Sequence, residues 1–138
     1  MQSKFRPFIR VVMVVACIAV MSSVTLAETK TFNVTASNVT GVESLDPYSR
    51  RAKKADDDVK FYVTAKTMSG KCPYVKFYMK NFATGKLYKS PMTYYRSSLG
   101  NTNSQEYGAE APKDRYYALY MQPASGYVNI NVTGNFTP

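Results

Sequence analysis

The chain has 138 residues, 18 of them basic and nine acidic, with no His, no Trp and a net charge of +9 at pH 7. Without His, the Ser-His-Asp and Cys-His arrangements of nucleophilic catalysis are excluded, as are zinc sites that use His. We therefore expect a protein that is not an enzyme, holds no cofactor and no metal, and favours acidic partners.

Residues 1–27 are predicted to be a signal peptide. Basic residues come first (Lys4, Arg6 and Arg10), an apolar run covers residues 11–20, and Ala27 provides a small residue for cleavage. The apolar run is shorter than the roughly 20 residues of a membrane-spanning helix, which disfavours an anchor. Lipid attachment at Cys17 is an alternative, although the apolar run continues past that residue. We expect a protein that is secreted or associated with the cell envelope.

Residues 28–138 are expected to form one domain, which is near the commonest domain size. Three of the 18 basic residues precede residue 28 and all nine acidic residues follow residue 27, so this part has a net charge of +6. It contains a single cysteine, Cys72, and so cannot form an internal disulfide. A buried, unreactive thiol is the favoured interpretation, with an intermolecular disulfide or a reactive thiol as alternatives.

The domain shows the two-residue alternation of half-buried strands, beginning with a strand over residues 32–39. The following segment, residues 46–58, places four basic residues before three acidic ones. Opposed blocks of this kind are typical of a solvated connection, and we expect one here. A basic docking patch and a dibasic cleavage site are the alternatives.

Two strands follow, joined by a turn at residues 69–71. In the first strand, Val59, Phe61, Val63 and Ala65 are predicted to face the core. In the second, the inward set is Val75, Phe77 and Met79. Residues 81–86 are predicted to form a hairpin connection.

The rest of the chain predicts a short strand at residues 92–95, a loop at 97–103 and a strand at 116–121. In the last strand, Val128, Ile130 and Val132 are expected to face inward. About six to eight short strands bounded by turns predict an all-β antiparallel sandwich or small barrel, preceded by the signal-peptide helix.

The candidate binding site is the outward side of the two strands on either side of the turn, where Lys and Tyr alternate. Its residues are Lys60, Tyr62, Lys66, Tyr74, Lys76, Tyr78 and Lys80. If the two strands pair, these side chains form one surface that stacks sugar rings and attracts anionic groups. The alternative is an ordinary solvated sheet, because Tyr favours strands and outward Lys protects edges. Nothing indicates specific nucleic-acid binding.

Other chemistry has weaker support. Glu106, Glu110 and Asp114 are the least clustered carboxylates, and a glycosidase needs two at a fixed separation. The run of three acidic residues at 56–58 lacks the spacing of a calcium-binding loop. Four N-x-T triplets, at Asn33, Asn38, Asn131 and Asn135, fit glycosylation acceptors, but alternation within strands produces the same triplets.

Three segments carry a family resemblance: residues 52–59 before a Tyr-containing strand, residues 116–120, and the closing residues 132–138. With the basic leader, they resemble small, mostly uncharacterised exported β-sandwich proteins of Gram-positive bacteria. The resemblance implies a β-sandwich outside the membrane and supplies no catalytic residue.

We therefore expect a non-enzymatic module that binds an anionic envelope polymer, a glycan, a membrane surface or a protein partner. A bacteriocin-like antibacterial or membrane-active protein is the alternative, and a hydrolase that uses paired carboxylates is the least supported.

Overall fold

The computed structural model describes residues 27–36, 51–88 and 90–138. The predicted signal peptide up to residue 26, the lipidation candidate Cys17, the triplet at Asn38 and residues 46–50 of the expected connection lie outside the described residues. Among those described, no helix is long and apolar enough to cross a bilayer.

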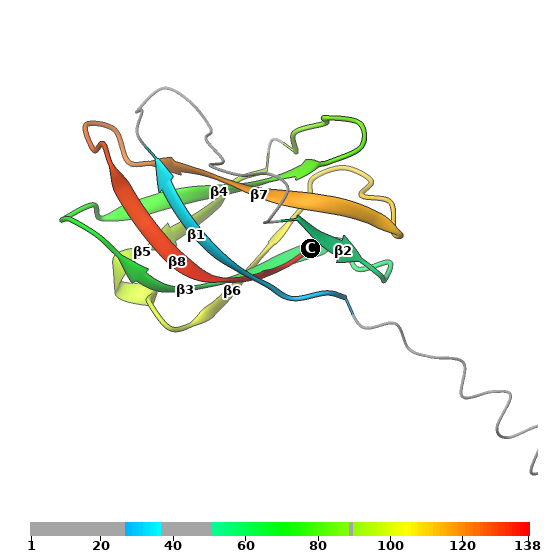
Figure 1. Cartoon of the computed structure of the whole chain (residues 1–138), viewed down its shortest axis with the longest axis horizontal. Helices are drawn as coiled ribbons and strands as arrows, with labels where there is room; N and C mark the ends of the chain where they lie inside the picture. Colours follow the sequence, from blue (N-terminus) through cyan, green and yellow to red (C-terminus); the bar gives the residue numbers. More distant parts are fainter. Residues whose placement is uncertain (1–26, 37–50, 89) are drawn as a thin grey trace, which may run out of the picture.

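Eight strands form two four-stranded sheets that pack face to face (Figure 1). The strands are β1 (Lys30–Ala36), β2 (Arg51–Lys54), β3 (Lys60–Met68), β4 (Tyr74–Asn81), β5 (Met92–Tyr95), β6 (Thr102–Glu106), β7 (Arg115–Pro123) and β8 (Ile130–Thr137), with a 3₁₀ turn, η1 (Arg96–Ser98), after β5. One sheet has the order β1-β8-β3-β6 and the other β2-β7-β4-β5. All the pairings are antiparallel, which confirms the predicted all-β sandwich.

Aromatic side chains from both sheets fill the interior. Phe32 of one sheet meets Phe77 of the other edge to face, with ring centroids 5.6 Å apart, and Phe77 meets Tyr94 at 6.0 Å. A second cluster contains Phe61, Tyr88, Tyr107 and Tyr117. Such pairs contribute beyond their buried area, so packing alone can hold the two sheets together.

Three buried tyrosines also anchor loops through their hydroxyl groups. The Tyr94 hydroxyl lies 2.6 Å from the carbonyl oxygen of Asn101 and 2.8 Å from that of Ser98, so its single hydrogen is shared between the two acceptors. In the second aromatic cluster, Tyr88 donates to Glu110 O at 2.9 Å and Tyr117 to Pro112 O at 2.8 Å. The 107–114 segment is therefore held against the end of the sandwich by the core itself.

Gly134 lies in the middle of β8, between β1 and β3. A Cβ atom at this position would collide with the Thr64 carbonyl and crowd the Phe32 ring. Its backbone conformation is ordinary, so the close approach of β3, rather than a left-handed dihedral angle, requires glycine here.

Two predicted inward residues are wrong because the strands begin later than the alternation indicates. Val59 is 63% exposed and precedes β3, and Val128 is 49% exposed and precedes β8. Asn129 separates Val128 from the strand and has a positive φ of 54°, which breaks the extended backbone. The remaining predicted inward residues of β3, β4 and β8 are buried.

Two strands lie in segments predicted to be connections. Residues 51–54 form β2, which pairs with β7 and buries Ala52 and Lys54. Part of the predicted 97–103 loop belongs to β6, which pairs with β3 along the edge of its sheet. Its sequence, TNSQE, contains no apolar residue, so it carried no alternation to detect.

Candidate ligand-binding face

The seven candidate residues do not form one surface, because β3 and β4 do not pair. β3 lies in the β1-β8-β3-β6 sheet and β4 in the β2-β7-β4-β5 sheet. The crossing loop, residues 69–73, carries the chain from one sheet to the other. Lys60, Tyr62 and Lys66 therefore lie on one outer face of the sandwich, and the four residues of β4 lie on the opposite face.

The β4 group gains neighbours that the sequence did not assign to it. Outward side chains of β2, β5 and β7 extend the surface, which we name the tyrosine face. It consists of Tyr74, Tyr78, Tyr95, Tyr116 and Tyr120 with Arg51, Lys53, Lys76, Lys80, Thr93, Ala118 and Gln122. None of these outward positions on the four strands is Asp or Glu.

Cross-strand register orders the tyrosine face into rows. Tyr78 lies opposite Tyr120, and Tyr74 opposite Tyr95, whose ring lies 5.9 Å away edge to face. Lys76 lies between these two pairs along β4. Successive outward side chains of a strand are about 6.6 Å apart, so aromatic and cationic groups alternate at that interval.

Two cations of this face lie over aromatic rings. The Lys80 ammonium lies 5.2 Å from the centre of the Tyr120 ring, and the Arg51 guanidinium lies 4.9 Å from that of Tyr116. These contacts hold positive charge close to the sheet surface. Lys53 differs, since its ammonium lies 3.4 Å from the Asp114 carboxylate at the end of the sheet.

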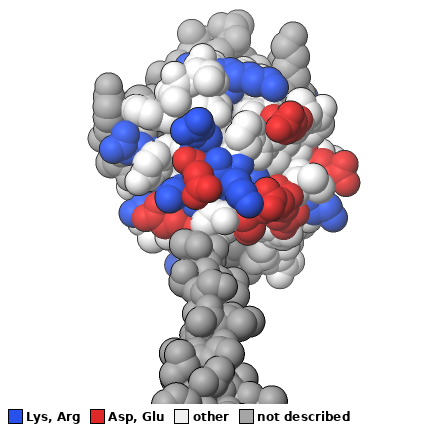
Figure 2. Space-filling view, turned by 90° about the vertical axis from the view of Figure 1, so that its right-hand side faces the viewer, with Lys and Arg blue, Asp and Glu red and all other residues white. Residues whose placement is uncertain are grey.

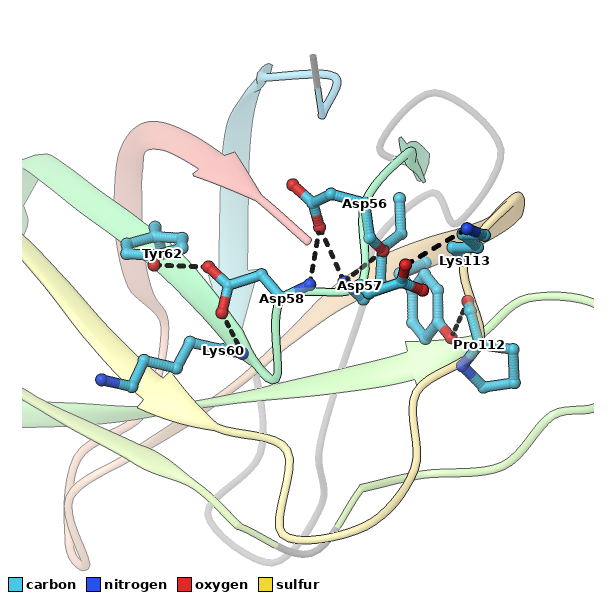
Figure 3. A network of polar contacts seen from close by, with 9 residues as sticks. Asp56, Asp57, Asp58, Lys60, Tyr62, Pro112 and Lys113 are labelled. Carbon is cyan, nitrogen blue, oxygen red and sulfur yellow. Dashed lines mark hydrogen bonds and ion pairs between the residues drawn. The ribbon is translucent and has the colours of Figure 1, made fainter. Parts of the chain in front are cut away.

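Two residues of the β3 group contact Asp58, which lies just before the strand. The Tyr62 hydroxyl donates to Asp58 Oδ2 at 2.6 Å, and the Lys60 backbone N–H donates to the other oxygen at 3.1 Å (Figure 3). The Tyr62 hydrogen bond is the main reason that the pKa of Asp58 is lowered. Lys66 is exposed at the irregularity in β3. This outer face is otherwise rich in Thr and Asn, so these three residues do not form a basic aromatic surface.

The carboxylates of the described residues all lie at one end of the sandwich. They are Glu28, Asp56, Asp57, Asp58, Glu106, Glu110 and Asp114. Figure 2 looks onto this end, where acidic and basic side chains interleave. Two exposed ion pairs are Lys30–Glu28 at 2.6 Å and Lys113–Asp57 at 3.1 Å.

Lys54 is the exception to surface pairing, because its side chain is 0% exposed. The ammonium donates to both the carbonyl and Oδ1 of Asp56 at 2.9 Å and lies 5.9 Å from the centre of the Tyr107 ring. The expected solvated connection is therefore wrong over residues 51–54. The alternation in β2 buries the aliphatic stem of Lys54, and Asp56 lies close enough to compensate its charge.

A concavity of about 380 Å³ adjoins the same end and is lined by Asp57, Asp58, Glu106, Glu110 and Lys113, among others. It thus contains two of the three carboxylates considered for a glycosidase. A glycosidase needs a protonated carboxylic acid beside a carboxylate. Here the Tyr62 hydrogen bond lowers the pKa of Asp58, so Asp58 is not suited to be that acid. In the described part of the chain, no three carboxylate or thiol groups converge as metal ligands.

Cys72 lies in the crossing loop and is fully buried in the core, and its thiol donates to the Tyr74 carbonyl at 3.0 Å. This confirms the interpretation of a buried thiol. An intermolecular disulfide through Cys72 would require the crossing loop to open.

The described N-x-T triplets place Asn33, Asn131 and Asn135 on the outer face of β1 and β8. Asn131 Nδ2, the atom that would carry a glycan, donates to Asn33 Oδ1 at 2.6 Å and to Thr35 Oγ1 at 3.0 Å. Attachment there would break these cross-strand contacts.

Comparison of the chain with models of known protein families gives no match, and comparison with curated protein sequences gives none either. The residues of the tyrosine face are therefore the basis on which a function is assigned.

Proposed function

We propose that the protein is a non-enzymatic module, secreted or associated with the cell envelope, that binds anionic or glycan-bearing polymers through the tyrosine face. The observation that carries the proposal is the composition of this face. Tyr, Lys and Arg occupy most outward positions of β2, β4, β5 and β7, and no carboxylate occupies any of them.

The position of the carboxylates supports this choice of face. They lie at one end of the sandwich, and the two that contact the face do so at Lys53: Glu28 accepts from its backbone N–H at 2.9 Å, and Asp114 lies 3.4 Å from its ammonium. A negatively charged polymer lying along β4 would meet Lys76 and Lys80 without passing a carboxylate on that strand. Attraction to such a polymer is largely electrostatic and weakens as salt rises.

The test is a pull-down of the segment Glu28–Pro138, which contains all eight strands, on isolated cell envelopes across a salt series. The double variant Lys76→Glu and Lys80→Glu should lose retention at low salt. The double variant Lys60→Glu and Lys66→Glu makes the same change in net charge on the opposite face and is the matched control.

Loss of retention in the first variant alone supports the proposal. Equal loss in both indicates attraction to net charge without a face, and retention by both would overturn the proposal. Leakage of dye from anionic vesicles, measured with the same proteins, would instead support a membrane-active protein.

A further inference from the structure

Lys76 occupies the centre of the tyrosine face. Its cross-strand neighbours are Gln122 on β7 and Thr93 on β5, and its outward neighbours along β4 are Tyr74 and Tyr78. Among the described residues, no carboxylate pairs with its ammonium. We name Gln122, Lys76 and Thr93 the polar row.

The polar row presents mainly hydrogen-bond donors. The Tyr78 hydroxyl donates to Gln122 Oε1 at 3.1 Å, which uses one of the two lone pairs of that oxygen. The amide nitrogen of Gln122 remains a donor beside the three N–H groups of the Lys76 ammonium. Donors around a cation match a group with several acceptor oxygens, such as a carboxylate or a phosphate.

Aromatic pairs border the polar row on both sides. Tyr78 and Tyr120 lie on one side, and Tyr74 and Tyr95 on the other. Along the strand direction, each pair is displaced by about 6.6 Å from Lys76. Tyr95 is 54% exposed, although its ring also contacts that of Tyr74. A bare chain of phosphates has nothing to place on these rings, whereas the apolar faces of sugar rings can stack on them.

We propose that the polar row is a subsite for the acidic group of a sugar, and that the ligand is an acidic polysaccharide whose neighbouring rings stack on the two tyrosine pairs. This inference rests on the proposed function and makes its ligand specific. It requires both the cation and the rings, which separates it from charge attraction alone.

The experiment measures equilibrium binding of the segment Glu28–Pro138 at fixed ionic strength to three probes. Polygalacturonate offers charge and rings, inorganic polyphosphate offers charge alone, and dextran offers rings alone. The inference predicts tighter binding to polygalacturonate than to polyphosphate at equal charge concentration, and no measurable binding to dextran.

Two pairs of variants test the residues. Lys76→Gln should weaken polygalacturonate binding about tenfold, whereas the matched change Lys66→Gln on the opposite face should change it less than about twofold. Tyr95→Ala should weaken it about two- to tenfold and leave polyphosphate binding unchanged, while Tyr95→Phe keeps the ring and should retain affinity.

Two outcomes would overturn the inference and are distinguishable. Equal affinity for both polyanions, insensitive to Tyr95→Ala, would remove the acidic-sugar subsite and leave a purely electrostatic face, so the proposed function would stand. Absence of binding to either polyanion and to isolated envelopes would remove the proposed function as well.

Discussion

Replacing Arg96 by Ala should destabilise the crossing loop, because the Arg96 guanidinium donates hydrogen bonds to three carbonyl oxygens in or next to that loop. Nε donates to Cys72 O, Nη1 to Met68 O and Nη2 to Ser69 O, each at 2.9 Å. The Arg96 backbone N–H also donates to Pro73 O at 2.9 Å, and the substitution keeps that bond. The side chain therefore joins η1 to the segment that connects the two sheets.

The expected cost follows from these three bonds. A hydrogen bond to a charged group contributes about 1.5–3 kcal/mol when its partner is left buried. Ser69 is exposed, so water replaces the guanidinium at its carbonyl and the loss there is smaller. We expect the free energy of unfolding to fall by about 2–4 kcal/mol, a large share of the roughly 5–15 kcal/mol typical of a domain.

Urea unfolding, followed by tyrosine emission because the chain has no Trp, measures this change. The transition midpoint should fall by about 2 M. Arg96→Lys keeps the charge but not the planar fork, so we expect it to recover only a minor part of the loss. Arg115→Ala removes the same charge from an exposed position and should shift the midpoint little. Equal midpoints for the Arg96→Ala and Arg115→Ala variants would refute the reasoning.

Three further predictions concern other contacts. Lys54→Met should leave the free energy of unfolding unchanged or raise it, whereas Asp56→Asn should lower it by about 1–2 kcal/mol, since it leaves the buried ammonium without its carboxylate. Asp56 is 46% exposed, which keeps the loss below that of a fully buried pair. Thermal unfolding measures both variants, and a Lys54→Met variant less stable than the Asp56→Asn variant would contradict this prediction. Tyr62→Phe should raise the pKa of Asp58, which is followed by NMR titration. The lowered pKa stabilises the fold above the unfolded-state value of about 3.9, so wild type should exceed this variant near neutral pH and the difference should shrink as the pH falls through the folded-state pKa. Gly134→Ala should lower the free energy of unfolding by about 3 kcal/mol or more, or prevent folding, because the new methyl group must displace β3. A soluble variant with the wild-type urea midpoint would be evidence against the close approach of β8 and β3.

The local sequence pattern was sufficient to predict the strands in which apolar residues alternate with polar ones. The short strand at residues 92–95 has the predicted bounds, and the inward residues of β4 are those expected. β2 and β6 were missed for physical reasons. β2 buries a lysine that reads as a surface charge, and β6 is an edge strand that needs no apolar side chain.

The order of strands across the sheets could not be derived from local pattern. Only β4 and β5 are neighbours in both sequence and sheet, so the pairing of β3 with β4, which a single candidate surface required, does not occur. The sequence therefore predicted the β4 residues of the tyrosine face, but it grouped them with β3 residues that lie on the opposite face of the sandwich. Tyr95, Tyr120 and Gln122 could be placed beside Lys76 only once the register was known.

The strand order also has a kinetic consequence. β8 is central to one sheet, between β1 and β3, and β7 is central to the other, between β2 and β4. Both come from residues 115–138, the last part of the chain. Neither sheet can form its central pairings until this part has been synthesised. Nearly all native strand pairings join segments that are far apart in sequence, so each must close a long loop. We therefore expect folding to be slow for a domain of this size. Until β8 has been synthesised, β1 and β3 lack the strand that pairs with both of them, and the nascent chain must stay soluble with these strand edges unpaired.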